Sequence, residues 1–292
     1  MEEERCMNCV MIILNYNDSR RAWRLAQKCN SFKNIEKVVI VDNCSSDDSI
    51  DYFSKQNLNN EIDFVFSKEN NGFASGNNQG AKYALEKYKP EYLFFANTDT
   101  IFQEDDVEAC LKKLSGDERL GLVSMRMKDI NGNEEKSSWK FKPFYEYLLL
   151  YFWVYRHWNY DKYTYKKFRK GFQYVDVVRG SFMMFRARAF SKVNFFDENT
   201  FLYYEEDIIS HRLREANFKI GILTNRFYIH NHIYSGKKNA FFIKHHLDRS
   251  LKYFLVNYYK IGNLKKIAFN FCALLGDLDL FLVENLDRRK ND

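Results

Sequence analysis

Tyr92-Leu93-Phe94-Phe95-Ala96-Asn97-Thr98-Asp99 decides the fold class, because an apolar run is followed at once by polar residues. A short strand that is apolar throughout is typical of a sheet covered by helices on both faces. The polar residues then fall where the strand ends. We expect residues 92–96 to form a buried strand, with Asn97-Thr98-Asp99 at its carboxyl end.

The same pattern recurs along the chain as far as residue 125. Apolar runs alternate with segments of helical spacing, as they do in a parallel sheet with helical crossovers. We expect strands at 10–14, 37–41, 62–66, 92–96 and 120–125, and helices at 19–30, 46–55, 74–88 and 104–114. This order predicts an α/β fold with a mostly parallel, Rossmann-like sheet flanked by helices.

Polar clusters follow three of these strands, namely Asn15-Tyr16-Asn17, Asp42-Asn43 and Asn97-Thr98-Asp99. Such sheets bind ligands beyond the carboxyl ends of their strands, so we expect the clusters to converge. The Asp42 carboxylate can accept a hydrogen bond from a pyrimidine imide or a ribose hydroxyl. Asn and Asp also simply end strands and begin turns, but three clusters together favour a nucleotide site.

The bulk composition is that of a folded globular chain. Of its 292 residues 46% are hydrophobic, and the formal net charge is +6. Both signs of charge are mixed, without a dense basic stripe, so we expect no nucleic-acid partner. Cys6 and Cys9 form a CxxC, but no second pair follows at zinc spacing, which indicates reduced thiols.

The N-terminus, Met1-Glu2-Glu3-Glu4-Arg5, lacks the basic start and apolar centre of a signal peptide. No uninterrupted apolar run reaches the roughly 18 residues of a membrane span. We therefore expect the protein in the cytoplasm, with peripheral contact to the inner face of the cell membrane as one option.

A glycine-rich element, residues 70–80, joins a predicted strand to a predicted helix. Glycine permits close backbone approach, and a helix start supplies free N–H groups for phosphate. Turns of this kind are common and do not define a site alone.

Two acidic segments could carry chemistry. Asp99 lies where a divalent cation could bridge it to a diphosphate, and Mg²⁺ or Mn²⁺ prefers such oxygen ligands. Glu205-Glu206-Asp207 opens a predicted helix, where the macrodipole favours acidic residues. Adjacent carboxylates also raise one another's pKa, which suits a general base. His230 is either a metal ligand or a hydrogen-bonded, partly buried histidine.

The order of these motifs resembles that of the inverting family 2 glycosyltransferases with the GT-A fold, particularly bacterial rhamnosyltransferase-like members that build surface polysaccharides. The resemblance covers residues 10–236. The matching segments are residues 10–17, 41–47, 70–80, Asn97-Thr98-Asp99, Arg179-Gly180-Ser181-Phe182-Met183-Met184, 196–207 and 230–235. Each motif alone is loose, but seven in the correct order are specific.

The resemblance implies a role for particular residues. Asp99 would bind the metal and the donor diphosphate, Asp42 the nucleoside, and His230 the metal. Asp207, with Glu206 beside it, would deprotonate the acceptor hydroxyl. We expect the donor to contact Asn15, Tyr16, Asn17, Asp42, Asn70, Gly72, Asn78, Asn97 and Asp99. We expect the acceptor to contact Gly180, Ser181, Tyr204 and Glu205.

The chain departs from the family pattern at several positions. Asn97 replaces the first carboxylate of the DXD motif, so the metal would rest on Asp99, His230 and the diphosphate. Ile209 stands where relatives often carry a further Asp, so Glu206 or Glu205 could share the duties of Asp207. Val256 precedes Asn257 where many relatives have Arg-Asn, and no role carries over.

The predicted reaction is a single displacement that inverts the anomeric carbon. A UDP- or dTDP-sugar would donate to a hydroxyl of a glycan or undecaprenyl-linked oligosaccharide in capsule or O-antigen synthesis, with Mn²⁺ or Mg²⁺ as cofactor. A nucleotidyltransferase would carry a glycine-rich basic loop where this chain has Asn15-Tyr16-Asn17-Asp18. A non-catalytic binding protein for nucleotide sugars or polysaccharides remains the other alternative, because of Asn97.

We divide the chain into a catalytic domain, 1–236, and a C-terminal helical segment, 237–292. The domain comprises a nucleotide-binding half at about 9–126, an aromatic and basic insertion with helical parts at about 131–174, and an acceptor half at about 175–236. The C-terminal segment alternates aromatic and basic residues at helical spacing. This suits an anionic membrane surface or a hairpin packed on the domain or across a homodimer interface, and the sequence favours neither.

Overall fold

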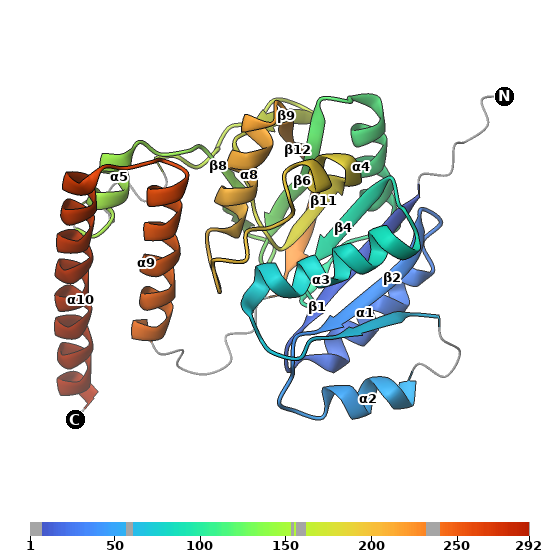
Figure 1. Ribbon diagram of the computed structural model, residues 1–292, viewed down its shortest axis with the longest axis horizontal. Coiled ribbons are helices and arrows are strands. Elements are labelled where there is room, and N and C mark those ends of the chain that lie inside the picture. The colour runs from blue at the N-terminus through green and yellow to red at the C-terminus, as the bar shows by residue number, and fades with distance from the viewer. Residues whose placement is uncertain (1–7, 57–60, 153–154, 156–161, 232–239, 292) are drawn as a thin grey trace.

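The computed structural model describes residues 8–56, 61–152, 155, 162–231 and 240–291. A ten-stranded sheet forms its centre, with the strand order β3-β2-β1-β4-β11-β6-β12-β5 and with β7 and β9 attached at the side. Helices cover both faces of this sheet, and two further helices stand at one end of the molecule (Figure 1). The predicted α/β class is confirmed.

The N-terminal half alternates strands and helices as predicted. Its strands are β1 (Cys9–Asn15), β2 (Ile35–Asp42), β3 (Asp63–Phe66) and β4 (Tyr92–Ala96). Its helices are α1 (Ser19–Asn30), α2 (Ser49–Gln56), α3 (Gly72–Lys87) and α4 (Glu104–Gly116). The four strands pair in parallel, so their carboxyl ends share one edge.

The second half adds strands of both directions. They are β5 (Thr100–Ile101), β6 (Leu120–Lys128), β7 (Glu134–Glu135), β8 (Ser138–Trp139), β9 (Phe172–Val175), β10 (Val177–Val178), β11 (Phe182–Arg186) and β12 (Lys219–His230). The helices are α5 (Phe144–Leu149), α7 (Ala187–Lys192), α8 (Glu205–Glu215), α9 (Ala240–Asn257) and α10 (Asn263–Asn291). β11 lies antiparallel between β4 and β6, while β12 is parallel to β6. The sheet is therefore mixed, and the expectation of a mostly parallel sheet holds only for the N-terminal half.

The strands are buried on both faces, which explains their continuous apolar runs. Met11 and Ile13 of β1 belong to the core layer under α1, α2 and α4. Val10 and Ile12 belong to the opposite layer, under α3, α7 and α8. Successive side chains of a strand point to opposite faces, so one strand supplies both layers.

The insertion contains more strand than predicted. The expected helical part is α5, but β8 pairs with β10 in a small second sheet, and β9 joins the main sheet beside β12. Residues 153–154 and 156–161 of this insertion, like Ser235 and Cys6, lie outside the described residues.

The C-terminal helices pack on the α/β part of the chain through a third apolar cluster. This cluster joins Tyr147 of α5, Ile208 of α8, Phe254 of α9 and Phe269 of α10. Phe254 is fully buried and the Tyr259 hydroxyl donates to the Lys142 carbonyl at 2.8 Å. The aromatic residues of the C-terminal segment therefore pack against the rest of the chain. Among the described residues, no helix combines the length and apolar character needed to cross a bilayer.

Candidate active site

The end of β4 meets the start of β11 at the centre of the sheet edge. Their antiparallel pairing places Phe182 opposite Ala96, and the Asn97 N–H donates to the Ser181 carbonyl at 3.0 Å. Gly180 and Ser181 are thereby brought beside Asn97, although they lie far apart in the sequence. The expectation of a parallel sheet does not predict this contact, because it depends on the antiparallel pairing of β11 with β4.

A second strand pairing brings the two predicted metal ligands together. β12 pairs antiparallel with β5, with His230 opposite Thr100, and the Asn231 N–H donates to the Asp99 carbonyl at 2.8 Å. His230 Nε2 lies 3.1 Å from Asp99 Oδ1, and the two side chains are only 12% and 11% exposed. The predicted proximity of Asp99 and His230 is therefore present in the structure.

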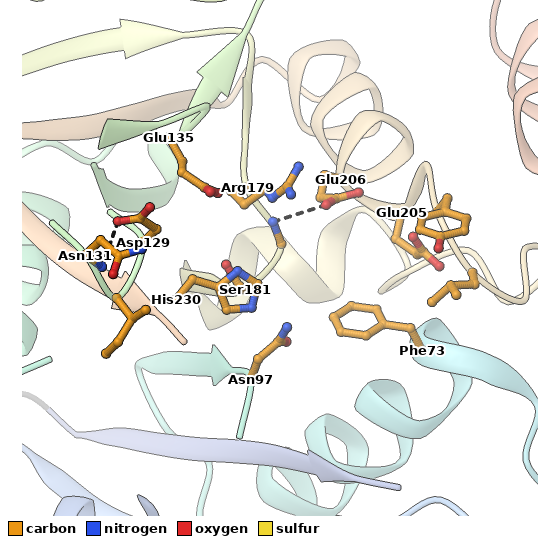
Figure 2. Close-up of a pocket in the computed structure, with 14 residues that line it drawn as sticks. Phe73, Asn97, Asp129, Asn131, Glu135, Arg179, Ser181, Glu205, Glu206 and His230 are labelled. Carbon is orange, nitrogen blue, oxygen red and sulfur yellow. Dashed lines mark hydrogen bonds between the residues drawn. The ribbon is translucent and has the colours of Figure 1, made fainter. Parts of the chain in front are cut away.

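A cavity of about 600 Å³ opens at this edge. Six of the predicted site residues line it: Asn97, Gly180, Ser181, Glu205, Glu206 and His230. Asn97, Ser181 and His230 lie on one side of the cavity, and Glu205 and Glu206 on the other (Figure 2). One cavity therefore joins the metal side of the predicted site to its carboxylate side.

The turn before α8 directs the carboxylates into this cavity. Tyr203 and Tyr204 have φ values of 73° and 69°, the left-handed region that costs a non-glycine residue about 1–3 kcal/mol. Tyr203 lines the cavity, whereas Tyr204 packs against Phe254 of α9. The assignment of Tyr204 to the acceptor stays a prediction, and of the two tyrosines Tyr203 is the one that faces the cavity.

Glu205 and Glu206 differ in their environments. Burial, followed by the charge of Glu206, raises the pKa of Glu205 to about 8. The buried Glu205 Oε1 has no hydrogen-bond partner among the described residues. Glu206 Oε1 accepts the Gly180 N–H at 3.2 Å, and a Cβ at Gly180 would lie 2.8 Å from that oxygen. A side chain at position 180 would therefore displace the Glu206 carboxylate from this position.

Asp207 is buried next to the insertion rather than at the cavity wall. Burial raises the pKa of its carboxyl to about 6, while the nearby charge of Lys142 and a hydrogen bond from Trp139 oppose that rise. Trp139 Nε1 donates to Asp207 Oδ1 at 3.1 Å. A carboxylate with this pKa is ionised at neutral pH and is more basic than an ordinary aspartate.

Two lysines of the insertion complete this environment. Lys136 Nζ lies 4.4 Å from the centre of the Trp139 ring. Burial, and secondly the charge of Lys142, lowers the pKa of Lys136 to about 8. Burial also lowers the pKa of Lys142. These lysines could not be predicted from the sequence, because nothing in their spacing ties the insertion to Asp207.

The ends of β1 and β2 are linked by a buried polar network. Asn15 Nδ2 donates to Asp42 Oδ1 at 2.7 Å, and the Ser45 N–H donates to Asp42 Oδ2 at 2.9 Å. Asn17 Oδ1 accepts the Ser46 N–H at 2.8 Å, while Tyr16 is 50% exposed. The predicted convergence of the first two clusters is present, with most of their polar groups bonded to each other.

The glycine-rich element contacts the segment at residues 196–201 directly, within the part of the chain predicted to bind the acceptor. Gly72 has φ +91°, and a Cβ there would lie 2.0 Å from the Phe201 carbonyl oxygen. Asn70 Oδ1 accepts the Gly72 N–H at 3.1 Å. Asn78 Nδ2 donates to the Phe196 carbonyl at 2.9 Å, and its Oδ1 accepts the Phe196 N–H at 3.0 Å. Asn78 therefore joins α3 to the acceptor half, and its assignment to the donor remains a prediction that this placement disfavours.

A second network fixes the helix that carries the carboxylates. Asp197 Oδ2 accepts Arg212 Nη2 of α8 at 2.8 Å and the Tyr253 hydroxyl of α9 at 2.9 Å. The Tyr258 hydroxyl also donates to this oxygen. Because Asp197 contacts both helices, it couples α9 to the orientation of α8.

The residues present fit a divalent cation in part. Asp99 and His230 offer a carboxylate oxygen and an imidazole nitrogen, a pair that suits Mn²⁺ better than Mg²⁺. In the part of the chain that the structure describes, no group of three or more His, Cys, Asp or Glu could hold a metal. A bound cation would need further ligands from the donor diphosphate or from water.

Several cavity residues were not assigned a role from the sequence. Arg179 lies between Glu135 and Glu206, and Asp129 and Asn131 form the wall beyond His230 (Figure 2). Arg179 immediately precedes Gly180, so its position in that motif was an available signal. The turn between β6 and β7 carries no comparable signal, because Asp and Asn are ordinary turn residues.

Residues 11–193 match the profile of Glycosyl transferase family 2. The chain belongs to this family. It is 25% identical over 214 residues to the low-salt glycan biosynthesis hexosyltransferase Agl10 of Haloferax volcanii, covering 72% of this chain and 63% of that protein. It is 27% identical over 157 residues to the rhamnosyltransferase WbbL of Escherichia coli, covering 51% of this chain and 56% of that protein. The family 2 chain thus spans less than two thirds of either relative.

Solved structures agree on the fold. GalNAc-T7, crystallised with UDP, GalNAc and Mn²⁺, superposes with a TM-score of 0.63 at 13% sequence identity, covering 88% of this chain and 50% of that one. At this identity the likeness shows the GT-A fold alone. The fold expected from the order of the motifs is confirmed.

Proposed function

We propose that this family 2 protein is a metal-dependent, inverting glycosyltransferase that moves a sugar from a UDP- or dTDP-sugar to a hydroxyl of a glycan or lipid-linked glycan. The observation that carries the proposal is the shared cavity. His230, which contacts Asp99, lines it together with Glu205 and Glu206. A single displacement requires one side that holds the donor phosphates and a facing side whose carboxylates meet the acceptor hydroxyl.

The acceptor hydroxyl loses its proton as its oxygen attacks the anomeric carbon, and the bond to the diphosphate oxygen breaks. We assign the proton to Asp207 Oδ2, because Oδ1 accepts the hydrogen bond from Trp139. One displacement at the anomeric carbon inverts its configuration. Positioned general bases of this kind contribute roughly 10²–10⁴-fold in rate.

Glu206 is the competing candidate for the base. It lines the cavity, whereas Asp207 lies behind the wall, but the Gly180 N–H already binds Glu206 Oε1. We assign Glu206 to hold the turn at Gly180-Ser181, before β11, in place. Asp207→Asn should therefore cost more in transfer rate than Glu206→Gln, and the reverse order would make Glu206 the base.

Asp99 and His230 would hold the cation. When bound, it supplies positive charge that stabilises the departing nucleoside diphosphate. Asp99 is positioned for this by the backbone bond from Asn231, and His230 by its pairing with Thr100. Mn²⁺ in the solved neighbour GalNAc-T7 supports a cation at this site, and the hexosyl- and rhamnosyltransferase names of the relatives support sugar transfer.

The experiment is a panel of UDP- and dTDP-sugars incubated with the protein and Mn²⁺, with released nucleoside diphosphate as the readout. We expect release from at least one donor, rising with added glycan acceptor. A binding protein with a decayed site would bind a donor by calorimetry but release no diphosphate. Release of pyrophosphate from a nucleoside triphosphate and a sugar phosphate would instead indicate a nucleotidyltransferase.

The cellular setting follows from the proposed acceptor. A lipid-linked glycan of capsule or O-antigen synthesis would be met at the inner face of the cell membrane, which fits a cytoplasmic protein with peripheral contact. Cell fractionation tests this, since recovery only outside the membrane and cytoplasmic fractions would contradict it.

A further inference from the structure

The carboxylate side of the cavity begins with a turn whose backbone is strained. Leu202 and Tyr203 of this turn line the cavity, and α8 follows with Glu205. Tyr203 and Tyr204 both adopt the left-handed conformation, with φ values of 73° and 69°. Residues other than glycine keep this conformation only where the surrounding structure holds it in place. Groups outside the turn must therefore supply that support.

Helix α9 contacts this turn from the C-terminal part of the chain. The Ser250 hydroxyl, which is buried, donates to the Leu202 carbonyl at 2.8 Å. The buried Phe254 ring lies against the Tyr204 ring, with 5.8 Å between the ring centres. Ser250 and Phe254 are four residues apart, so they lie on one face of α9. This face therefore contacts the turn on both sides of Tyr203.

Tyr258 lies directly after the end of α9, four residues beyond Phe254, and contacts α8. Its hydroxyl accepts a hydrogen bond from Arg212 Nε of α8 at 2.8 Å and donates to Asp197 Oδ2. Arg212 Nη2 donates to the same carboxylate oxygen at 2.8 Å, and the Asp197 side chain is only 2% exposed. The three side chains bond one another, and they tie the end of α9 to the helix that begins with the carboxylates.

The residue after Tyr258 contacts the other segment that meets at Asp207. The Tyr259 hydroxyl donates to the Lys142 carbonyl at 2.8 Å. Three residues before Lys142, Trp139 Nε1 donates to Asp207 Oδ1. The chain from α9 to Tyr259 therefore contacts both α8 and the insertion, the two segments that enclose the proposed base.

The hydrogen bonds of this segment fix direction as well as proximity. An apolar contact holds two groups near each other, whereas a hydrogen bond weakens steeply when its donor and acceptor are misaligned. α9 stands between α10 and the sheet (Figure 1). It also lies outside residues 11–193, which match the family profile. The family match therefore assigns α9 no part in the site.

We propose that α9 is a positioning element of the active site, in which Ser250 and Tyr258 hold the carboxylate side of the cavity in place. Ser250 fixes the turn that presents Tyr203 to the cavity, and Tyr258 fixes α8, which begins at Glu205. The consequence for acceptor binding rests on the proposed function. The position of the turn does not rest on it.

Hydrogen exchange followed by mass spectrometry tests the position of the turn without any substrate. Ser250→Ala removes the bond to Leu202, so the amides of residues 201–208 should exchange faster, while those of β4 should keep their wild-type rates. Ser115→Ala is the matched control, because the Ser115 hydroxyl donates to the Lys112 carbonyl at 3.0 Å on the exposed side of α4, and it should leave residues 201–208 unchanged.

Two outcomes of this experiment would overturn the proposal. One is wild-type exchange of residues 201–208 in Ser250→Ala. The other is equally faster exchange in β4, since that result would show a general loss of stability.

Tyr258→Phe tests the second contact and does not depend on the folding of Ser250→Ala. The variant keeps the ring and removes the hydroxyl that bonds Asp197 and Arg212, so the amides of α8 should exchange faster. Tyr83→Phe is its control, because the Tyr83 hydroxyl donates to the Asp63 carboxylate at 2.8 Å in another part of the chain. Wild-type exchange of α8 in Tyr258→Phe would remove Tyr258 from the proposal.

Steady-state kinetics test the consequence for the acceptor, with the donor and the acceptor glycan that give diphosphate release in the panel described above. Ser250→Ala should raise the acceptor KM by roughly three- to ten-fold, with little change in kcat and with the wild-type donor Kd in the presence of Mn²⁺. A role in folding alone would lower kcat through loss of active protein and leave the acceptor KM unchanged, and that result would overturn the proposal.

Failure of the proposed function would look different. A wild type that releases no diphosphate from any donor would refute the proposed function, and the exchange of residues 201–208 would still decide whether α9 holds the turn.

Discussion

Trp139→Phe offers the sharpest test of how the proposed base is tuned. The change keeps a ring under Lys136 but removes the N–H that donates to Asp207 Oδ1 at 3.1 Å. The charged form of Asp207 loses a hydrogen bond, while the protonated form loses little. The pKa of the carboxyl therefore rises above its present value of about 6.

The size of this rise follows from ordinary hydrogen-bond energies. A hydrogen bond to a charged group contributes roughly 1.5–3 kcal/mol. At about 1.36 kcal/mol for each pH unit, the pKa of Asp207 would move to about 7–8. The base must be deprotonated to act, so the acid limb of the rate profile moves to higher pH. At pH 7 the ionised fraction falls from about nine-tenths to between about one-tenth and one-half.

The assay is nucleoside diphosphate release at saturating donor, measured from pH 5 to pH 9 on the wild type and Trp139→Phe. Trp23→Phe is the matched control, because Trp23 is equally buried in the core under α1 and touches no proposed catalytic group. The Trp139 variant should recover most of its rate at high pH. Superimposable pH profiles for Trp139→Phe and the wild type would refute the reasoning.

Further outcomes are expected at four other positions. Asp99→Asn and His230→Ala should each lower diphosphate release at least ten-fold and raise the Mn²⁺ concentration needed for half-maximal rate, and an unchanged metal titration would count against both as ligands. Gly72→Ala should lower the free energy of unfolding by more than 1 kcal/mol, because the new Cβ meets a backbone carbonyl at 2.0 Å. Gly116→Ala, where a Cβ has open space, should be neutral in the same urea titration. Glu205→Gln should keep most of the transfer rate at pH 7, where a carboxyl with a pKa of about 8 is protonated. If the wild-type rate changes as the pH rises through 8, the rate of the variant should not show that change. A large loss at pH 7 would show that the ionised form is needed.

The sequence predicted the N-terminal half of the sheet well, because a strand that is buried on both faces, such as Tyr92–Ala96, is apolar at every position. It could not predict that β11 lies antiparallel beside β4, since an apolar strand carries no mark of its neighbour's direction. That pairing is what delivers Gly180 and Ser181 to Asn97. Strand pairing across the chain also explains why His230 reaches Asp99.

Local geometry that the sequence does not reveal bears on two of the site predictions. The two left-handed residues before α8 turn Tyr203 toward the cavity, while Tyr204, predicted to contact the acceptor, packs against Phe254. Asn78 matched a donor motif, but its amide bonds the backbone of Phe196. The sequence indicates Trp139 only as part of the insertion. Its contact with Asp207 depends on the small β8–β10 sheet, and two-residue strands leave no pattern in the sequence from which this sheet could be predicted.

The most direct test of the central claim separates donor binding from transfer in one variant. Asp207→Asn should bind the donor in the presence of Mn²⁺ with the wild-type Kd by calorimetry, because the Asp207 side chain is bonded to Trp139 of the insertion and is not among the residues that line the cavity with His230. Its rate of diphosphate release with acceptor should fall at least a hundred-fold. A variant that binds donor normally and transfers at the wild-type rate would contradict the assignment of Asp207 as the base.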